Sequence, residues 1–258
     1  HANLQGTDLR GRPLHAAILY GANLAGANLR GCVAELCMLD EADLSDADLS
    51  DASFQQVSMT GARLERANLE GTAFEGTDLA GVDWSTVDMD VLSLARCNFK
   101  GGVFAFNRFL RCDLTGSDFT DADLEGAIFD RCILTQVNFQ RANLVKARFL
   151  EPDGKGAFFG EARLEDAKIE GGRLRYSTFT EAQGERVSLA QCDLRDSILE
   201  RVHLVGADLR GARLQHSDLS HARLDGADFR DADLSDANLH AVTEEGTKFD
   251  GASTLRMK

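Results

Sequence analysis

The chain has 258 residues, and its 28 Lys and Arg against 42 Asp and Glu give a formal net charge of −14. This negative charge disfavours direct binding to nucleic acid. No apolar stretch approaches the roughly 20 residues of a membrane-spanning helix, so no membrane span is expected.

A five-residue repeat runs through the chain without a change of register. Stepping by five from Leu4 to Thr254 meets 51 positions, and 46 of them carry a large apolar residue. The position two residues earlier is small and is usually Ala. The exceptions at the large position are Ala34, Gly154, Gly184, Glu244 and Thr254. Such fixed-period similarity predicts a repeat architecture built of stacked units.

The period of five excludes regular secondary structure over the length of the chain. On an α-helix these large residues would spiral around the axis, and on a straight strand they would alternate between opposite faces. They can face one core only if the backbone turns a corner in each unit. Gly is frequent two residues after the large position, as at Gly21, Gly26 and Gly31, and it eases such turns.

Two series of phenylalanines predict the size of one coil. Within each series the spacing is twenty residues, so like side chains stack if one coil contains four units and four corners. The series are Phe99, Phe119, Phe139, Phe159 and Phe179, and Phe109, Phe129 and Phe149.

The tandem unit A(D/N)LXX, as in ADLSDADLSDASF at residues 42–54, resembles the pentapeptide-repeat family over almost the whole chain. The resemblance implies an all-β fold, a right-handed quadrilateral β-helix of about 13 coils of four five-residue units. We expect one continuous β-helix over residues 1–258. Because His1 and Ala2 lie in mid-repeat, we expect it to be part of a larger chain without its native N-terminus, and either cytoplasmic or a secreted effector.

The acidic residues concentrate on one edge of this expected rod. With four faces per coil, the two adjoining faces through Leu39 and Leu44 each sum to a charge of −6. This acidic edge includes Asp43, Asp46 and Asp123. It is an alternative candidate for a partner-binding surface.

The segment GGVFAFNRFLRCD breaks the polarity of the repeat. Val103, Phe106 and Leu110 occupy outward positions that should be polar, and Arg108 and Arg111 flank them. Exposed apolar clusters often mark protein interfaces. We therefore predict a partner-binding surface formed by these five residues, called the Phe106 patch below. The other interpretation is that these side chains fold over their own coil.

Two units, 152–156 and 182–186, have Gly in place of the large residue and are expected to be irregular. They could leave the coil as loops. The phenylalanine series favours bulged edges that still fill their places, because a looped-out unit would shift Phe159 and Phe179 away from Phe99.

Cysteines and histidines give no sign of a cofactor or metal site. All six cysteines lie at the small inward position and are expected to be small buried residues in the thiol form. His221 and His240 would lie on neighbouring coils, with His216 around the corner, an arrangement that we interpret as accidental. The cysteines are Cys32, Cys37, Cys97, Cys112, Cys132 and Cys192.

No catalytic constellation is present in the repeat. The carboxylates fall on outward positions, whereas acid–base catalysis needs a cleft that shifts a pKa. We predict a non-enzymatic protein–protein interaction or scaffold module with unidentified protein partners and an open oligomeric state. It could be an accessory domain of a bacterial effector or secretion-associated protein. The alternative is a DNA-mimicking protein that protects a topoisomerase such as gyrase, as in the quinolone-resistance proteins.

Overall fold

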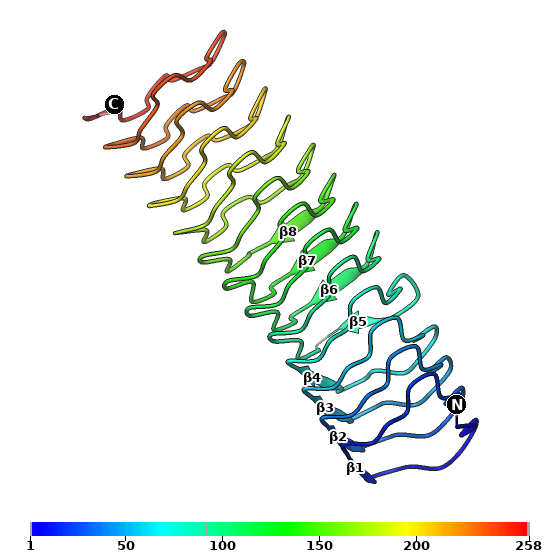
Figure 1. Ribbon diagram of the computed structural model, residues 1–258. Coiled ribbons are helices and arrows are strands. Elements are labelled where there is room, and N and C mark those ends of the chain that lie inside the picture. Colours follow the sequence, from blue (N-terminus) through cyan, green and yellow to red (C-terminus); the bar gives the residue numbers. More distant parts are fainter. Residues whose placement is uncertain (1, 91, 257–258) are drawn as a thin grey trace.

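Nearly every five-residue unit contributes one short parallel bridge to the coils before and after it. The computed structural model describes residues 2–90 and 92–256, and they contain no helix. Asn23, for example, pairs with Asn3 and with Asp43, each twenty residues away. The coils stack into one rod with the chain termini at opposite ends (Figure 1). The expected β-helix with four units per coil is therefore confirmed.

Eight coils have bridges extensive enough to form strands. The first parallel sheet contains, in order, β1 (Pro13–His15), β2 (Val33–Glu35), β3 (Ser53–Gln55) and β4 (Ala73–Glu75). The second contains β5 (Met89–Asp90), β6 (Arg108–Leu110), β7 (Ile128–Asp130) and β8 (Arg148–Leu150). These strands mark fewer coils than the about 13 expected, and isolated bridges carry the same twenty-residue register from Asn3 to Ser253.

The core is a single column of inward side chains. Both inward positions of the repeat are buried, as Ala42 and Leu44 illustrate. In the first phenylalanine series, stacked ring centroids lie 4.6 to 5.5 Å apart from Phe99 to Phe179. In the second, both spacings are 4.7 Å. Both predicted series are thus confirmed, and burying each ring contributes about 1.5–3 kcal/mol.

A left-handed residue forms the corner of nearly every unit. At Gly26 the φ angle is 63°, and across this corner the Ala27 N–H donates to the carbonyl of Leu24 at 2.9 Å. This is the arrangement of a type II turn, which needs a positive φ at its third residue and favours Gly there. Many corners hold other residues, such as Lys146 with φ 58°. Each of these costs about 1–2 kcal/mol of backbone strain.

The Asp or Asn that precedes the large residue supports the next corner. Oδ1 of Asp43 accepts the backbone N–H of Ser45 at 3.0 Å, and Asn138 accepts that of Gln140 at 3.0 Å. Short polar side chains of this type commonly bond to backbone two residues ahead. The unit A(D/N)LXX already showed Asp or Asn at these positions but not the reason. Their preference for Asp and Asn has this local cause.

The two units with Gly at the large position stay in the coil. Asp153 bridges to Ile133 and Arg173, and Gln183 bridges to its two neighbouring coils in the same way. A Cβ added at Gly154 would lie 2.8 Å from Cδ2 of Leu174, and one at Gly184 would lie 3.1 Å from Cδ2 of Leu204. The leucine of the following coil therefore fills the space that the missing side chain leaves.

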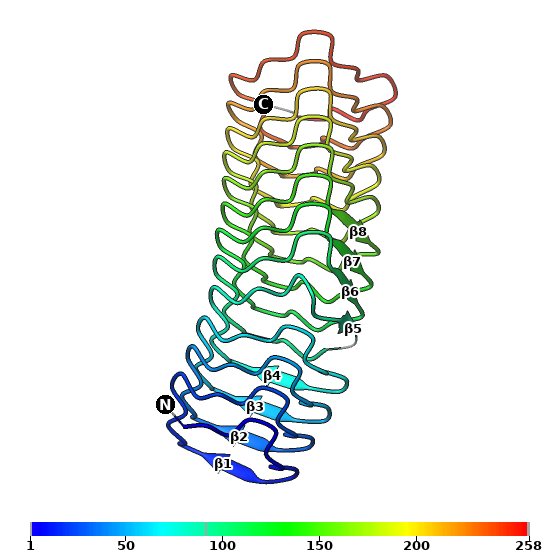
Figure 2. The ribbon, with the colours of Figure 1, turned by 90° about the vertical axis from the view of Figure 1, so that its right-hand side faces the viewer.

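The irregular part of the rod lies elsewhere, where residues 63–71 face residues 83–90. No bridge joins these two described segments, and pairing resumes with Ala73 and Ser93. A cleft of about 650 Å³ opens between them. The stack of coils changes direction there, between β4 and β5 (Figure 2). We call this break the open seam; the regular five-residue register gave no sign of it.

Two buried side chains lie at the open seam. Trp84 stacks on Phe104 at 5.8 Å and meets Phe99 edge-on at 5.6 Å. Asn107, at an inward position that is usually small, donates from Nδ2 to the carbonyls of Trp84 and Val87 at 3.0 and 3.2 Å. A buried amide thus binds backbone acceptors beside the break, where an unsatisfied carbonyl would be costly.

The phenylalanine column predicts a large loss of stability on truncation. Phe139→Ala should lower the free energy of unfolding by about 3–5 kcal/mol, because rings stacked above and below hinder collapse of the cavity. Arg148→Ala, on the surface of the same coil, should change it by less than about 0.5 kcal/mol. Urea titration of both variants measures this difference, and equal losses would contradict the inward placement of Phe139.

The left-handed corners predict opposite effects of Gly at two nearby surface positions. Lys146→Gly should raise the free energy of unfolding by about 0.5–1 kcal/mol, because it relieves a positive φ. Arg148→Gly, in the extended backbone of β8, should lower it by about 1 kcal/mol. The same urea titration compares the two, and a loss of equal size in both would contradict the strain at the corner.

Candidate functional site

The structure spreads the Phe106 patch around one coil. The Val103 residue is 40% exposed, while Phe106, at the following corner with φ 62°, is 73% exposed. Arg108 and Leu110 lie on the next edge in β6, where Leu110 is half-buried, and Arg111 occupies the corner after it. The patch therefore has its apolar centre at Val103 and Phe106, and Arg111 lies one corner farther on.

Two contacts hold the patch in place. An added Cβ at Gly126 would lie 2.6 Å from the ring of Phe106, so this ring covers the corner of the next coil. Nη2 of Arg108 contacts Oδ2 of Asp130 at 2.8 Å, and Arg131 binds the other oxygen of the same carboxylate at 3.0 Å. The Phe106 ring is thus packed on one side and open to solvent on the other.

Arginines interrupt the acidic edge. Arg66 binds both carboxylate oxygens of Asp46 at 2.7 and 2.6 Å, and this hydrogen bonding lowers the pKa of Asp46. Arg63 contacts Asp43 at 3.2 Å. Oδ1 of Asp123 instead accepts the side-chain amide of Asn143 at 2.9 Å. Two of the three acidic candidates are therefore neutralised within the rod.

The histidines do not assemble into a metal site in the part of the chain that the structure describes. His221 and His240 pack with their rings edge to face, 5.6 Å between centroids. Within residues 2–90 and 92–256, no group of three or more His, Cys, Asp and Glu could hold a metal ion. These same segments include no helix with the length and apolarity to cross a bilayer.

The six cysteines are free thiols in the core. Five of the sulfurs donate to a carbonyl of the preceding coil, as Cys97 does to Phe74 at 3.0 Å; they belong to Cys37, Cys97, Cys112, Cys132 and Cys192. Burial raises the pKa of Cys32 to about 11, and those of Cys97 and Cys192 to about 12. Thr72 donates in the same way to Leu49. The small inward position thus tolerates a small side chain that can donate a hydrogen bond, because a backbone carbonyl of the preceding coil lies within reach.

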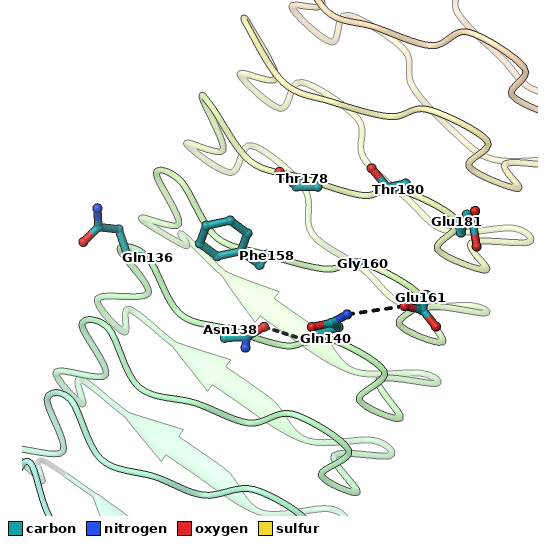
Figure 3. Close-up of a pocket in the computed structure, with 9 residues that line it drawn as sticks. All are labelled: Gln136, Asn138, Gln140, Phe158, Gly160, Glu161, Thr178, Thr180 and Glu181. Atoms are coloured by element: carbon teal, nitrogen blue, oxygen red, sulfur yellow. Dashed lines mark hydrogen bonds between the residues drawn. The ribbon is translucent and has the colours of Figure 1, made fainter.

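A groove on another face was missed by the sequence analysis. Gly160 occupies an outward position where the neighbouring coils have Gln140 and Thr180, and it lines a hollow of about 490 Å³ on this face. Figure 3 shows Phe158 at one end of this hollow and Glu161 and Glu181 at the other. We call it the Phe158 groove. It is lined by Gln136, Asn138, Gln140, Phe158, Gly160, Glu161, Thr178, Thr180 and Glu181.

A signal for this groove was present in the sequence. Phe158 is 48% exposed at an outward position, so it breaks the polarity of the repeat as Phe106 does. Phe158 directly precedes the large inward residue Phe159, so in the sequence the two look like a single apolar pair at the inward position. The glycine on the other side of Phe159 falls at an outward edge position, where its effect depends on the side chains of the adjacent coils.

Family comparisons match most of the chain. The family described as "Pentapeptide repeats (8 copies)" matches residues 17–56, 47–83, 58–90 and 203–240. The family described as "Pentapeptide repeat region" matches residues 104–179 and 122–197. The chain therefore belongs to the pentapeptide-repeat proteins. Curated protein sequences give no significant match to it.

Several solved structures of pentapeptide-repeat proteins are similar to this chain. Rfr23 from the cyanobacterium Cyanothece 51142 is 28% identical over 36% of this chain and 64% of its own, with a TM-score of 0.36. HetL from Nostoc sp. strain PCC 7120, involved in heterocyst differentiation regulation, is 23% identical over 98% and 91%, with a TM-score of 0.26. QnrB1, a plasmid-mediated fluoroquinolone resistance protein, is 17% identical over 92% and 93%, with a TM-score of 0.30. The family assignment rests on the repeat matches and not on these superpositions.

The buried thiols predict slow chemical modification of the folded protein. At pH 8 a thiol reagent should modify Cys97 and Cys192 far more slowly in the folded chain than in urea, because burial and the raised pKa disfavour the reactive thiolate. Mass mapping of modified cysteines over time measures the rates. Equal rates in buffer and in urea would contradict the buried placement.

Proposed function

We propose that this chain is a non-enzymatic protein-binding scaffold, a rod that presents fixed surface residues to a protein partner. The observation that carries the proposal is the exposure of Phe106 beside Val103. Large aromatic residues with an open face are typical anchors of protein interfaces. Of the 17 other aromatic residues, 14 occupy the inward position of the repeat, and the exposed exceptions are Tyr20, Phe158 and Tyr176.

The surroundings of Phe106 favour binding at a low cost in conformational entropy. The ring already packs over Gly126, and Arg108 is held by Asp130, so few side chains need to become ordered when a partner binds. Arg111 and the cluster of Arg108, Asp130 and Arg131, which carries one net positive charge, give the patch a positive border that would orient an acidic partner. The apolar centre and the basic border together define one contact surface.

The wider role is proposed on the same basis. A rod of this kind suits an accessory domain of a bacterial effector or secretion-associated protein, acting in the cytoplasm or after secretion. It requires a protein partner, no cofactor and no nucleic acid. The acidic edge at Asp43, Asp46 and Asp123 is the second candidate for the contact surface.

The alternative function is protection of gyrase by imitation of DNA. A DNA mimic needs a run of negative charges that remain available to its target. Arg63 and Arg66 bind Asp43 and Asp46 on the edge that would have to supply this run. These ion pairs favour the scaffold over the DNA mimic.

The scaffold proposal predicts that Phe106→Asn abolishes partner binding without affecting the fold. Asn tolerates the positive φ of this corner, and the ring that it removes is largely exposed. The matched control is Tyr176→Asn, since Tyr176 is an exposed aromatic residue at another left-handed corner with φ 62°. Affinity capture from an extract of the source organism, followed by binding curves for the captured protein, measures the effect.

Two outcomes would contradict the scaffold proposal. One is full binding of the captured partner by Phe106→Asn. The other is protection of DNA gyrase from a fluoroquinolone in a supercoiling assay, which would favour the DNA mimic instead. Thermal melting of the variants checks that a loss of binding is not a loss of fold.

A further inference from the structure

We propose that the Phe158 groove binds an arginine side chain presented by an extended segment of a partner protein. This surface is separate from the Phe106 patch. The inference depends on the proposed scaffold function only in that the ligand belongs to a protein. Three features of the groove carry it: its charge, its shape and its remaining hydrogen-bonding groups.

The charge of the groove is unbalanced. Glu161 and Glu181 occupy the same corner on successive coils, and no ion pair among the described residues includes either of them. Several other corner carboxylates meet an arginine of the adjacent coil, as Asp166 meets Arg186 at 2.8 Å, whereas the isolated corner residue Glu151 has no such partner in the described ranges. The two adjacent carboxylates repel each other, and a cation bound between them would offset this repulsion by attracting both.

The arginines nearest in sequence position do not supply this cation. Arg141, one coil before Glu161 at the same corner, binds Asp121 at 2.7 Å. Arg201, one coil after Glu181, lines a smaller hollow with the two glutamates, but its ion pair is with Glu200 at 2.5 Å. Among the described residues, one side chain hydrogen-bonds to either carboxylate: the amide of Gln140 donates to Oε1 of Glu161 at 3.3 Å. Both carboxylates therefore retain acceptor oxygens for a ligand.

The shape fits a long side chain that lies along the floor of the groove. Gly160 forms the floor, between the ring of Phe158 and the two glutamates (Figure 3). A side chain in this position would place its methylene groups against Phe158 and its charged end at Glu161 and Glu181. A guanidinium fits better than an ammonium, because its planar fork of donors can bind two carboxylates at once.

The walls of the groove suit an extended backbone on either side of that arginine. Asn138 is occupied, since its Nδ2 donates to Thr120 and its Oδ1 accepts from Gln140. Gln136, Thr178 and Thr180 also line the groove and carry groups that can donate and accept hydrogen bonds. They would bind the peptide groups of an extended segment, whereas the glutamates would select its arginine.

The test is a titration of the protein with the peptide Gly-Gly-Arg-Gly-Gly, monitored by amide chemical shifts in NMR. We expect saturable shifts centred on Gly160, Glu161 and Thr180, and at least tenfold weaker binding of the same peptide with citrulline in place of arginine. Citrulline keeps the shape of the side chain and removes its charge. A lysine peptide should bind several-fold more weakly than the arginine peptide.

Two variants separate binding from folding. Gly160→Leu should abolish the shifts and keep the fold, because a Cβ at this position would lie 3.7 Å from the nearest heavy atom, the carbonyl oxygen of Thr180, and the backbone φ is not left-handed. Glu181→Gln should weaken binding at least tenfold. The matched control is Glu151→Gln, an exposed corner glutamate elsewhere on the rod, which should leave the Kd unchanged.

The proposal is overturned if the citrulline peptide binds as tightly as the arginine peptide or if Gly160→Leu binds normally. It is also overturned if no saturable shift occurs up to about 10 mM peptide. Phe106→Asn should bind the peptide like the unmodified chain. A failure of this proposal is therefore distinguishable from a failure of the scaffold function.

Discussion

The whole structure depends on a backbone corner that turns in the left-handed region once in every five residues. Each corner redirects the chain so that the next large side chain points to the same axis as the previous one. Thr86 is the one described corner position without a positive φ, and it lies in the open seam. Where the corner is regular, parallel bridges and stacked rings follow. Where it is not, the coil loses its bridges to the preceding coil, although Asp83 and Met89 still pair with the following one.

The repeat made the fold predictable, because it constrains the same few positions in each unit. Period, coil size and core composition all follow from the spacing of residues such as Leu44 and Phe119, whose environment is defined by identical units above and below. Gly154 and Gly184 were harder to interpret. The leucine of the next coil fills each gap, and such compensation between coils is not visible in one unit of the sequence.

The candidate surfaces were only partly predictable. Phe106 could be recognised because an apolar residue at an outward position breaks a local rule. The acidic edge could not be judged from charge counts, because Arg66 reaches Asp46 from twenty residues away. The Phe158 groove depends on Gly160, whose significance lies in the missing side chain between two coils. The surface features of a solenoid thus depend on how neighbouring coils differ at the same position, whereas the repeat pattern describes one unit at a time.

Local departures from the repeat, rather than the repeat itself, distinguish the faces of this rod. A regular unit presents small polar groups and locally paired charges, which offer little to a partner. Phe106, Phe158 and the unpaired Glu161 and Glu181 each change one outward position while the inward positions stay intact. Because stability in a solenoid is a sum over neighbouring coils, such changes at the surface have little effect on the core.

The open seam is an interface between coils that lacks parallel bridges among the described residues, and it has a built-in optical reporter. In a nearest-neighbour description of a solenoid, the interface with the least stabilising contact opens most often. We therefore expect local opening to begin between residues 63–71 and 83–90. Trp84 is the only tryptophan in the chain and is fully buried beside this interface. The indole fluorescence of the protein therefore comes from the open seam alone. Its emission wavelength reports the entry of water there without any added label.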